Sequence, residues 1–138
     1  MRLLILLFVL LANSTIRSQE VKVEVPQIAI RMDLGETVEI EGILITFEKV
    51  LEDSRCPEKV QCVWAGRARV EVIVQAENED AVVKEVILGQ RLQHEVIDRK
   101  LYVNDEFIIK VISIRPYPEK PGILEDYSLL IRKVKNDQ

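Results

Sequence analysis

Both cysteines and the only tryptophan of the chain lie in one short segment, DSRCPEKVQCVWAG, at residues 53–66. Five residues separate Cys56 from Cys62, and Trp64 follows closely. A cysteine pair of this kind forms a disulfide, holds a metal ion or supplies a nucleophile, according to its compartment and its neighbours. The segment is therefore an active site, a metal site, a binding loop or a structural staple, and other parts of the sequence must decide among these.

The first 18 residues indicate the compartment. They carry an early arginine, an unbroken apolar run over residues 3–12 and then small polar residues, which is the layout of a secretory signal peptide. The run is too short to cross a bilayer, since a membrane helix needs about 20 apolar residues. We expect cleavage after Ser14 or Ser18, with residues 1–18 as the preferred signal peptide. The mature chain is then exported to the periplasm or the extracellular medium and has no membrane span.

In an oxidising compartment an even number of cysteines predicts a disulfide, here between Cys56 and Cys62. The bond closes a small ring, residues 56–62, and on the chain-entropy estimate it stabilises the fold by roughly 2 kcal/mol. A ring of this size shapes a loop more than it joins distant parts of a fold. Pro57 restricts the backbone of the ring further, so the side chains that follow it are presented on a constrained turn.

The neighbours of this ring predict a contact surface. Arg55 is expected either to pair with Asp53 or to lie over the ring of Trp64. Trp64 either packs over the open end of the fold or serves recognition, and the two roles are compatible. The candidate binding residues are Arg55, Glu58, Lys59, Gln61 and Trp64.

The run D-S-R-C-P followed by V-x-C-V-W-A-G, with ITFEKV just upstream, resembles a signature of small exported bacterial proteins of unknown function. The match is specific over residues 53–66 and weaker over ITFEKV and the closing YSLLI, so it covers about a fifth of residues 19–138. The resemblance implies export and a single β-rich domain. It carries over no catalytic residue.

Other routes to catalysis or metal binding lack partners in the sequence. His94 is the only histidine, and no Gly-x-Ser-x-Gly turn accompanies it, so a hydrolase triad is not predicted. Two cysteines and one distant histidine do not make four zinc ligands at familiar spacings. The acidic turn over residues 77–80 lacks the spaced ligand pattern of a calcium loop. We expect a protein without enzyme activity, without a metal and without a cofactor.

The net charge limits the classes of partner that the protein is expected to bind. It is −4 at pH 7 for the whole chain and becomes −6 if Arg2 and Arg17 leave with the signal peptide. Nucleic acids and anionic membranes require a concentrated positive face, so the sequence predicts neither as a partner. An envelope or extracellular protein is the expected partner, and the oligomeric state stays open.

A period of two dominates the chain beyond the first 20 residues, with no sustained helical period. An alternating run before the polar turn of residues 76–81 and an apolar-rich run that returns after it predict a hairpin over residues 67–88. Residues 90–100 are polar and form a helical turn or an irregular loop, and residues 116–122 are a connection stiffened by three prolines, with Tyr117 as an aromatic anchor. The runs predicted to be strands are residues 21–25, 36–42, 43–50, 67–76, 82–88, 106–116 and 127–134.

These runs predict an all-β, single-domain antiparallel β-sandwich over residues 19–138, with seven to eight strands and an immunoglobulin-like general architecture; a β-barrel is the alternative. The predicted function is that of a small exported binding or structural domain, without a catalytic centre, that presents the disulfide-closed loop of residues 56–62. The alternative is a protease inhibitor that uses this loop as a substrate mimic, with Lys59 in the specificity pocket of a trypsin-like enzyme, because a preorganised loop loses little entropy on binding.

Overall fold

A computed structural model describes residues 29–136, which form eight strands and no helix. The strands are β1 (Ala29–Asp33), β2 (Thr37–Ile40), β3 (Ile43–Asp53), β4 (Arg67–Gln75), β5 (Val82–Gly89), β6 (Lys100–Val103), β7 (Phe107–Arg115) and β8 (Ser128–Lys135). The predicted all-β class and the predicted strand number are confirmed. The expected signal peptide, residues 1–18, and the strand expected over residues 21–25 lie outside the described residues.

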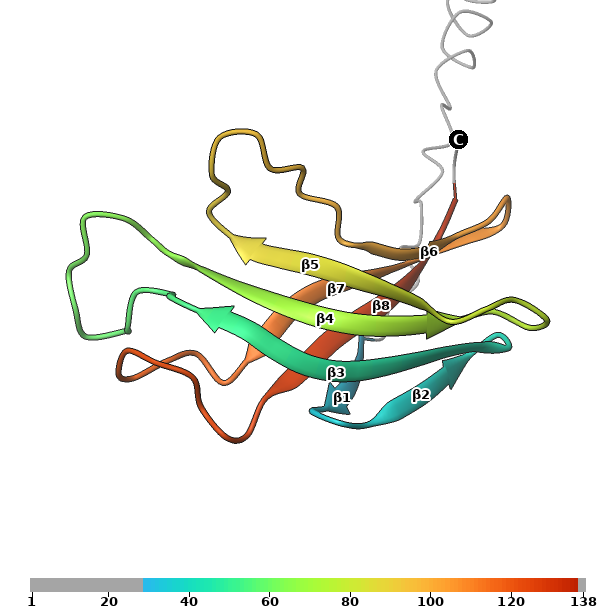
Figure 1. The fold of residues 1–138 in the computed structure, drawn as a ribbon, viewed down its shortest axis with the longest axis horizontal. Coiled ribbons are helices and arrows are strands. Elements are labelled where there is room, and N and C mark those ends of the chain that lie inside the picture. Colours follow the sequence, from blue (N-terminus) through green and yellow to red (C-terminus); the bar gives the residue numbers. More distant parts are fainter. Residues whose placement is uncertain (1–28, 137–138) are drawn as a thin grey trace, which may run out of the picture.

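The strands form two antiparallel sheets of four, one in the order β1-β8-β7-β6 and the other in the order β2-β3-β4-β5. The second sheet is a simple meander, and Figure 1 shows it lying across the first. The predicted sandwich is therefore confirmed, and the alternative of one closed barrel is not. The likeness to immunoglobulin domains stops at the two layers, because those domains divide neighbouring strands between their sheets while this meander keeps four consecutive strands together.

The alternation seen in the sequence builds the core. Ala68, Val70 and Val72 of β4 are completely buried, as are Ile45 and Phe47 of β3. The side chains between them, Thr46, Arg69 and Glu71, are polar or charged and point outward, which gives a sheet with one apolar and one solvated face. On that outer face ion pairs link neighbouring strands, for example Lys49 with Glu71 and Arg69 with Glu85.

Two short strands were not predicted. The strands β1 and β6 have five and four residues, and each lies at an edge of the first sheet. Neither run is long enough to show a period of two against its polar surroundings. Their pairing with β8 and β7 comes from contacts that are distant in sequence, and a pattern in one segment cannot reveal such contacts.

The two ends of the sandwich differ in how the strands are connected. At one end the chain turns through residues 41–42, 76–81 and 104–106. The opposite end carries three longer segments, which we name the disulfide loop (residues 54–66), the β5–β6 loop (residues 90–99) and the proline loop (residues 116–127). Figure 1 shows all three leaving the same end, which we call the loop end. Within residues 29–136 no helix is long and apolar enough to cross a membrane.

Candidate functional site

The disulfide loop is closed as predicted, by a bond between Cys56 and Cys62 whose Cα atoms are 5.9 Å apart. Inside the ring, the N–H of Val60 donates a hydrogen bond of 3.1 Å to the carbonyl of Pro57, which defines a β-turn. Disulfide and turn together shape a seven-residue ring. The ring therefore has a defined shape before any partner arrives.

Three of the predicted binding residues lie on this ring, and all three are exposed. Glu58 and Lys59 are the two central residues of the turn, and Gln61 follows it. The backbone N–H of Glu58 donates to the carbonyl of Pro118 at 3.2 Å, which attaches the ring to the proline loop. The structure thus places these side chains in solvent on a fixed backbone.

Arg55 and Asp53 form a buried ion pair at the base of the disulfide loop. Arg55 Nε donates to Asp53 Oδ1 at 2.8 Å and Nη2 donates to Oδ2 at 2.7 Å, a bidentate arrangement. The side chains are only 8% and 1% exposed. The other guanidinium bonds run to the carbonyls of Ile114 (3.2 Å) and Pro116 (3.0 Å). The pair therefore attaches the disulfide loop to the end of β7 and the start of the proline loop.

Tyr127 completes this buried group from the last residue of the proline loop. Its hydroxyl donates to Asp53 Oδ2 at 2.8 Å and accepts the N–H of Leu124 at 2.9 Å. Burial raises the pKa of Tyr127, and the bond to the Asp53 carboxylate raises it as well. The hydroxyl therefore stays protonated at neutral pH and continues to donate to the carboxylate.

The contacts of Arg55 settle one of the two expectations about it. It pairs with Asp53, as predicted, but the aromatic ring beside its guanidinium is that of Tyr117, 5.4 Å from the ring centroid, rather than that of Trp64. Its Nε, Nη1 and Nη2 atoms all donate hydrogen bonds within the protein, and its side chain is buried. Arg55 therefore positions the loops rather than offering its charge to a partner.

A second buried arginine joins the disulfide loop to the β5–β6 loop. Arg67, the first residue of β4, has a side chain only 7% exposed and binds the carboxylates of Glu52 and Glu95. The bonds from Arg67 lower the pKa of Glu52, while the pKa of Glu95 is lowered first by the backbone N–H of Leu92 and then by Arg67. The sequence analysis did not single out this contact, because Glu95 lies 28 residues further along the chain.

Gly66 allows the two ends of the disulfide loop to meet. Its φ is +72°, and a Cβ atom at this position would lie 1.8 Å from the carbonyl oxygen of Ser54. The N–H of Cys56 also donates to the carbonyl of Ala65 at 3.0 Å. Glycine is required at position 66, because only glycine combines this backbone angle with this spacing.

Exposed apolar side chains are concentrated on the three loops of the loop end. Seven of the twelve large apolar side chains that are exposed within residues 29–136 lie on the three loops. They are Val60, Val63, Trp64, Leu92, Val96, Tyr117 and Ile123. An apolar side chain on a loop gains nothing for the fold by facing water, so their concentration at one end points to an interaction surface.

Trp64 has an intermediate position in this surface. Its side chain is 39% exposed, so the indole is partly packed and partly available to solvent, while the neighbouring Val63 is fully exposed. Sequence reasoning named Trp64 and Tyr117 but not the aliphatic members of the surface. These aliphatic residues could have been noticed in the sequence, because valine and isoleucine occur there in segments that show no strand alternation and therefore have no predicted buried face.

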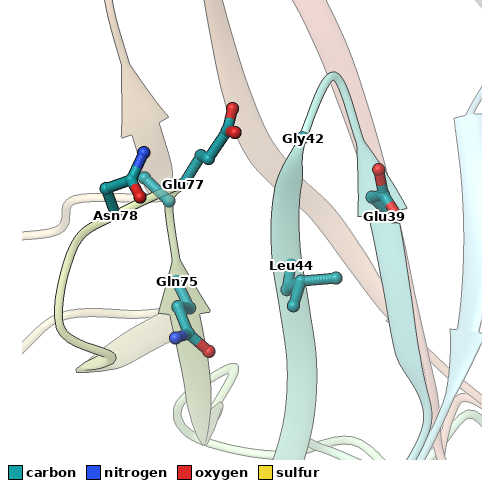
Figure 2. Close-up of a pocket in the computed structure, with 7 residues that line it drawn as sticks. Glu39, Gly42, Leu44, Gln75, Glu77 and Asn78 are labelled. Atoms are coloured by element: carbon teal, nitrogen blue, oxygen red, sulfur yellow. The ribbon is translucent and has the colours of Figure 1, made fainter.

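A different depression lies at the short-turn end. Figure 2 shows Glu39 and Glu77 on either side of Leu44, with Gln75 and Asn78 nearby, around a hollow of about 400 Å³. Its walls come from β2, β3, the end of β4 and the turns that follow β2 and β4. Leu44 is the cross-strand neighbour of Glu39 and Gln75. It contains two carboxylates and no basic side chain, and it has no group of side chains that would hold a metal ion.

His94 is exposed at the β5–β6 loop and has a positive φ of 73°. The part of the chain that the structure describes contains no cluster of three or more histidine, cysteine, aspartate or glutamate side chains suited to a metal. In comparisons with protein-family models, with curated proteins and with solved structures, nothing matches this chain. The loop end, with its exposed apolar side chains on fixed loops, is the feature of this fold that points to a function.

Proposed function

We propose that this protein is a small exported binding module that carries no catalytic centre and contacts a protein partner through its loop end. The observation that carries the proposal is the concentration of exposed apolar side chains on three loops whose backbones are held by a disulfide and two buried arginines. Binding surfaces on loops gain affinity when a rigid scaffold removes the cost of ordering them. The loop end combines both properties.

The proposed contact residues are Glu58, Lys59, Gln61 and Trp64 on the disulfide loop, together with the exposed Val63. Trp64 and the valine supply apolar area, and the polar side chains of the ring form a rim around it, which is the usual anatomy of a protein interface. Arg55 supports this surface from below. The expected partner is an envelope or extracellular protein, because a disulfide persists in oxidising compartments.

The rival function, protease inhibition by a substrate-like loop, has less support from the geometry. A protease groove receives an extended segment that pairs with it as a strand. Lys59 instead occupies the third position of the turn from Pro57 to Val60. The loop would have to unfold this turn before Lys59 could enter a specificity pocket, which would cost the preorganisation that motivated the idea.

Site-specific photo-crosslinking tests the proposal with a matched pair of positions. Val63 on the disulfide loop and Val103 at the end of β6 are both exposed valines, but they lie at opposite ends of the sandwich. A benzophenone amino acid placed at each position in turn, followed by irradiation in living producer cells, should give discrete crosslinked products from position 63 and none from position 103. Cell fractionation and N-terminal sequencing of the same protein test export and locate the cleavage site.

A second arm tests the contribution of the ring. Replacing both cysteines, Cys56→Ser with Cys62→Ser, should leave the sheets folded and reduce the yield of the position-63 crosslink, because the ring then samples many shapes. Equal crosslinking from positions 63 and 103, or crosslinking from neither, would remove the basis for a partner at the loop end. Undiminished crosslinking without the disulfide would show that the ring is not part of the contact.

A further inference from the structure

A cleft of about 350 Å³ opens beside the loop end, between the last residues of β5 and the second half of β7. It exists because β6 is short. The pairing between β6 and β7 stops at Lys110, and the carbonyl of Arg99 takes the N–H of Val111 at 2.9 Å, so from Ile112 onward no strand of residues 29–136 pairs with this side of β7. The exposed flank of β7 becomes one wall of the cleft.

The charges around the cleft are all of one sign. Three arginines line it, Arg55, Arg99 and Arg115, and no aspartate or glutamate does. In a chain with more acidic than basic residues, this is a local reversal of charge. Carboxylates dominate the other large hollow, where Glu39 and Glu77 have no basic neighbour in the lining.

Two of the three arginines are free to bind. The charge of Arg55 is neutralised by Asp53, as described above. The guanidinium groups of Arg99 and Arg115 make no hydrogen bond or ion pair with other side chains of residues 29–136. Arg99 is half-buried and is fixed next to β7 through its own backbone carbonyl, while Arg115 is exposed at the end of the strand. Guanidinium groups in such a position favour planar oxyanions, because their donors match the spacing of carboxylate oxygens.

The remaining wall of the cleft is apolar. Leu88 and Ile114 are buried at its base, and Tyr117 stands at its rim with its ring 40% exposed. Gly66 and Gly89 contribute backbone without side chains, which leaves the space open. The volume is at the lower end of the range for small-ligand sites. A ligand that fits must therefore combine one negative group with a compact apolar group.

From this arrangement we propose that the cleft binds an apolar carboxylate, with the carboxylate on Arg99 and Arg115 and the apolar group against Leu88, Ile114 and Tyr117. Two sources carry this chemistry, the last residue of a peptide chain and a free apolar acid. The site shares Tyr117 with the apolar surface of the loop end, but Val63 and Trp64 do not line it. A carboxylate can bind here whether or not a protein partner contacts Val63 and Trp64.

Three small probes with the same side chain test the proposal on the full chain. They are N-acetyl-leucine, its uncharged counterpart N-acetyl-leucinamide, and 4-methylpentanoate, which has no peptide group. Titration of the ¹⁵N-labelled protein should shift the backbone amides of residues 112–115 with a dissociation constant of about 1 mM or lower for a carboxylate probe. The amide should bind at least tenfold more weakly, because it forms no charge-assisted bonds. Tighter binding of N-acetyl-leucine than of 4-methylpentanoate would identify a peptide terminus as the source, and the reverse order a free acid.

Variants assign the binding to the arginines. Arg99→Gln and Arg115→Gln should each weaken the carboxylate probe about tenfold and leave the weak binding of the amide unchanged. Arg91→Gln is the matched control, because Arg91 is an exposed arginine of the same loop as Arg99 and does not line the cleft. The proposal is overturned if acid and amide bind equally, if no probe shifts residues 112–115 at 20-fold the expected dissociation constant, or if Arg91→Gln weakens binding as much as the cleft variants. Replacing Val63 affects only the proposed loop contact, so the two ideas fail separately.

Discussion

The buried pair of Asp53 and Arg55 makes the sharpest prediction about this fold. Asp53→Ala removes the acceptor of two guanidinium bonds and of the Tyr127 hydroxyl, and it leaves the charge of Arg55 without a partner in a site only 8% exposed. Breaking a buried pair in this way costs about 3–5 kcal/mol. Domains of this size are stable by about 5–15 kcal/mol, so the loss is a large fraction of the total.

The chain contains its own control. Arg31 and Asp33 are the same two residue types at the same spacing in sequence, also joined through Nε and Nη2, but their side chains are 69% and 64% exposed. Asp33→Ala should cost about 1 kcal/mol or less, since water replaces an exposed pair with little loss. Urea unfolding of the oxidised protein, followed by far-ultraviolet circular dichroism, gives both free energies of unfolding. The two variants should differ by about 3 kcal/mol.

The double variant Asp53→Leu with Arg55→Met separates a charge effect from a packing effect. If the cost of Asp53→Ala comes from an unpaired buried charge, removing both charges together should recover part of it, because two apolar side chains leave nothing to solvate. The recovery should be incomplete, since the bonds from Arg55 to the carbonyls of Ile114 and Pro116 are also lost. If Asp53→Ala costs no more than Asp33→Ala, or if the double variant is less stable than Asp53→Ala, the pair does not act as described.

Two further predictions concern the base of the disulfide loop. Gly66→Ala should destabilise the fold by several kcal/mol, because its Cβ would lie 1.8 Å from the Ser54 carbonyl oxygen. Gly42→Ala is the control: Gly42 has a similar φ of +77° but nothing within 4 Å, so this variant should cost only about 1–2 kcal/mol of backbone strain. Thermal unfolding measures the stability of both variants. The pKa values of Glu52 and Glu95 are lowered in the folded state, so their ionised carboxylates stabilise the fold above the ordinary pKa of 4.5, and this contribution is lost as the pH falls through the lower folded-state values. The free energy of unfolding should therefore decrease as the pH is lowered from 4.5. The decrease should be less steep in Arg67→Gln. An unchanged slope in that variant would mean that other carboxylates carry the effect.

Local pattern predicted the body of the sandwich well. In β3 and β4 the apolar residues alternate over enough positions to identify a buried face, and Ile45, Val70 and Val72 are indeed completely buried. The disulfide followed from cysteine count and compartment. The pairing of Arg55 with Asp53 was one of two expectations. It could be predicted from the sequence because the two residues are only two positions apart.

The loop end needed the folded structure. Tyr127 bonds to Asp53, 74 positions away in sequence, and Arg67 bonds to Glu95, 28 positions away. No local sequence pattern predicts either contact. The cleft with its two free arginines depends on where β6 ends beside β7, which is a property of strand pairing and not of any one segment.

The sequence alone determined the fold class, the two-sided strands and the covalent ring, because each depends on residue type and on spacing over a few positions. Tertiary structure decided which side chains are left in solvent at one end and which charges are left without a partner. Burial and charge pairing depend on what the rest of the chain brings to a point in space. Here they make Arg55, a contact candidate, a buried support, and they leave Arg99 and Arg115, which line the cleft, without a side-chain partner among residues 29–136.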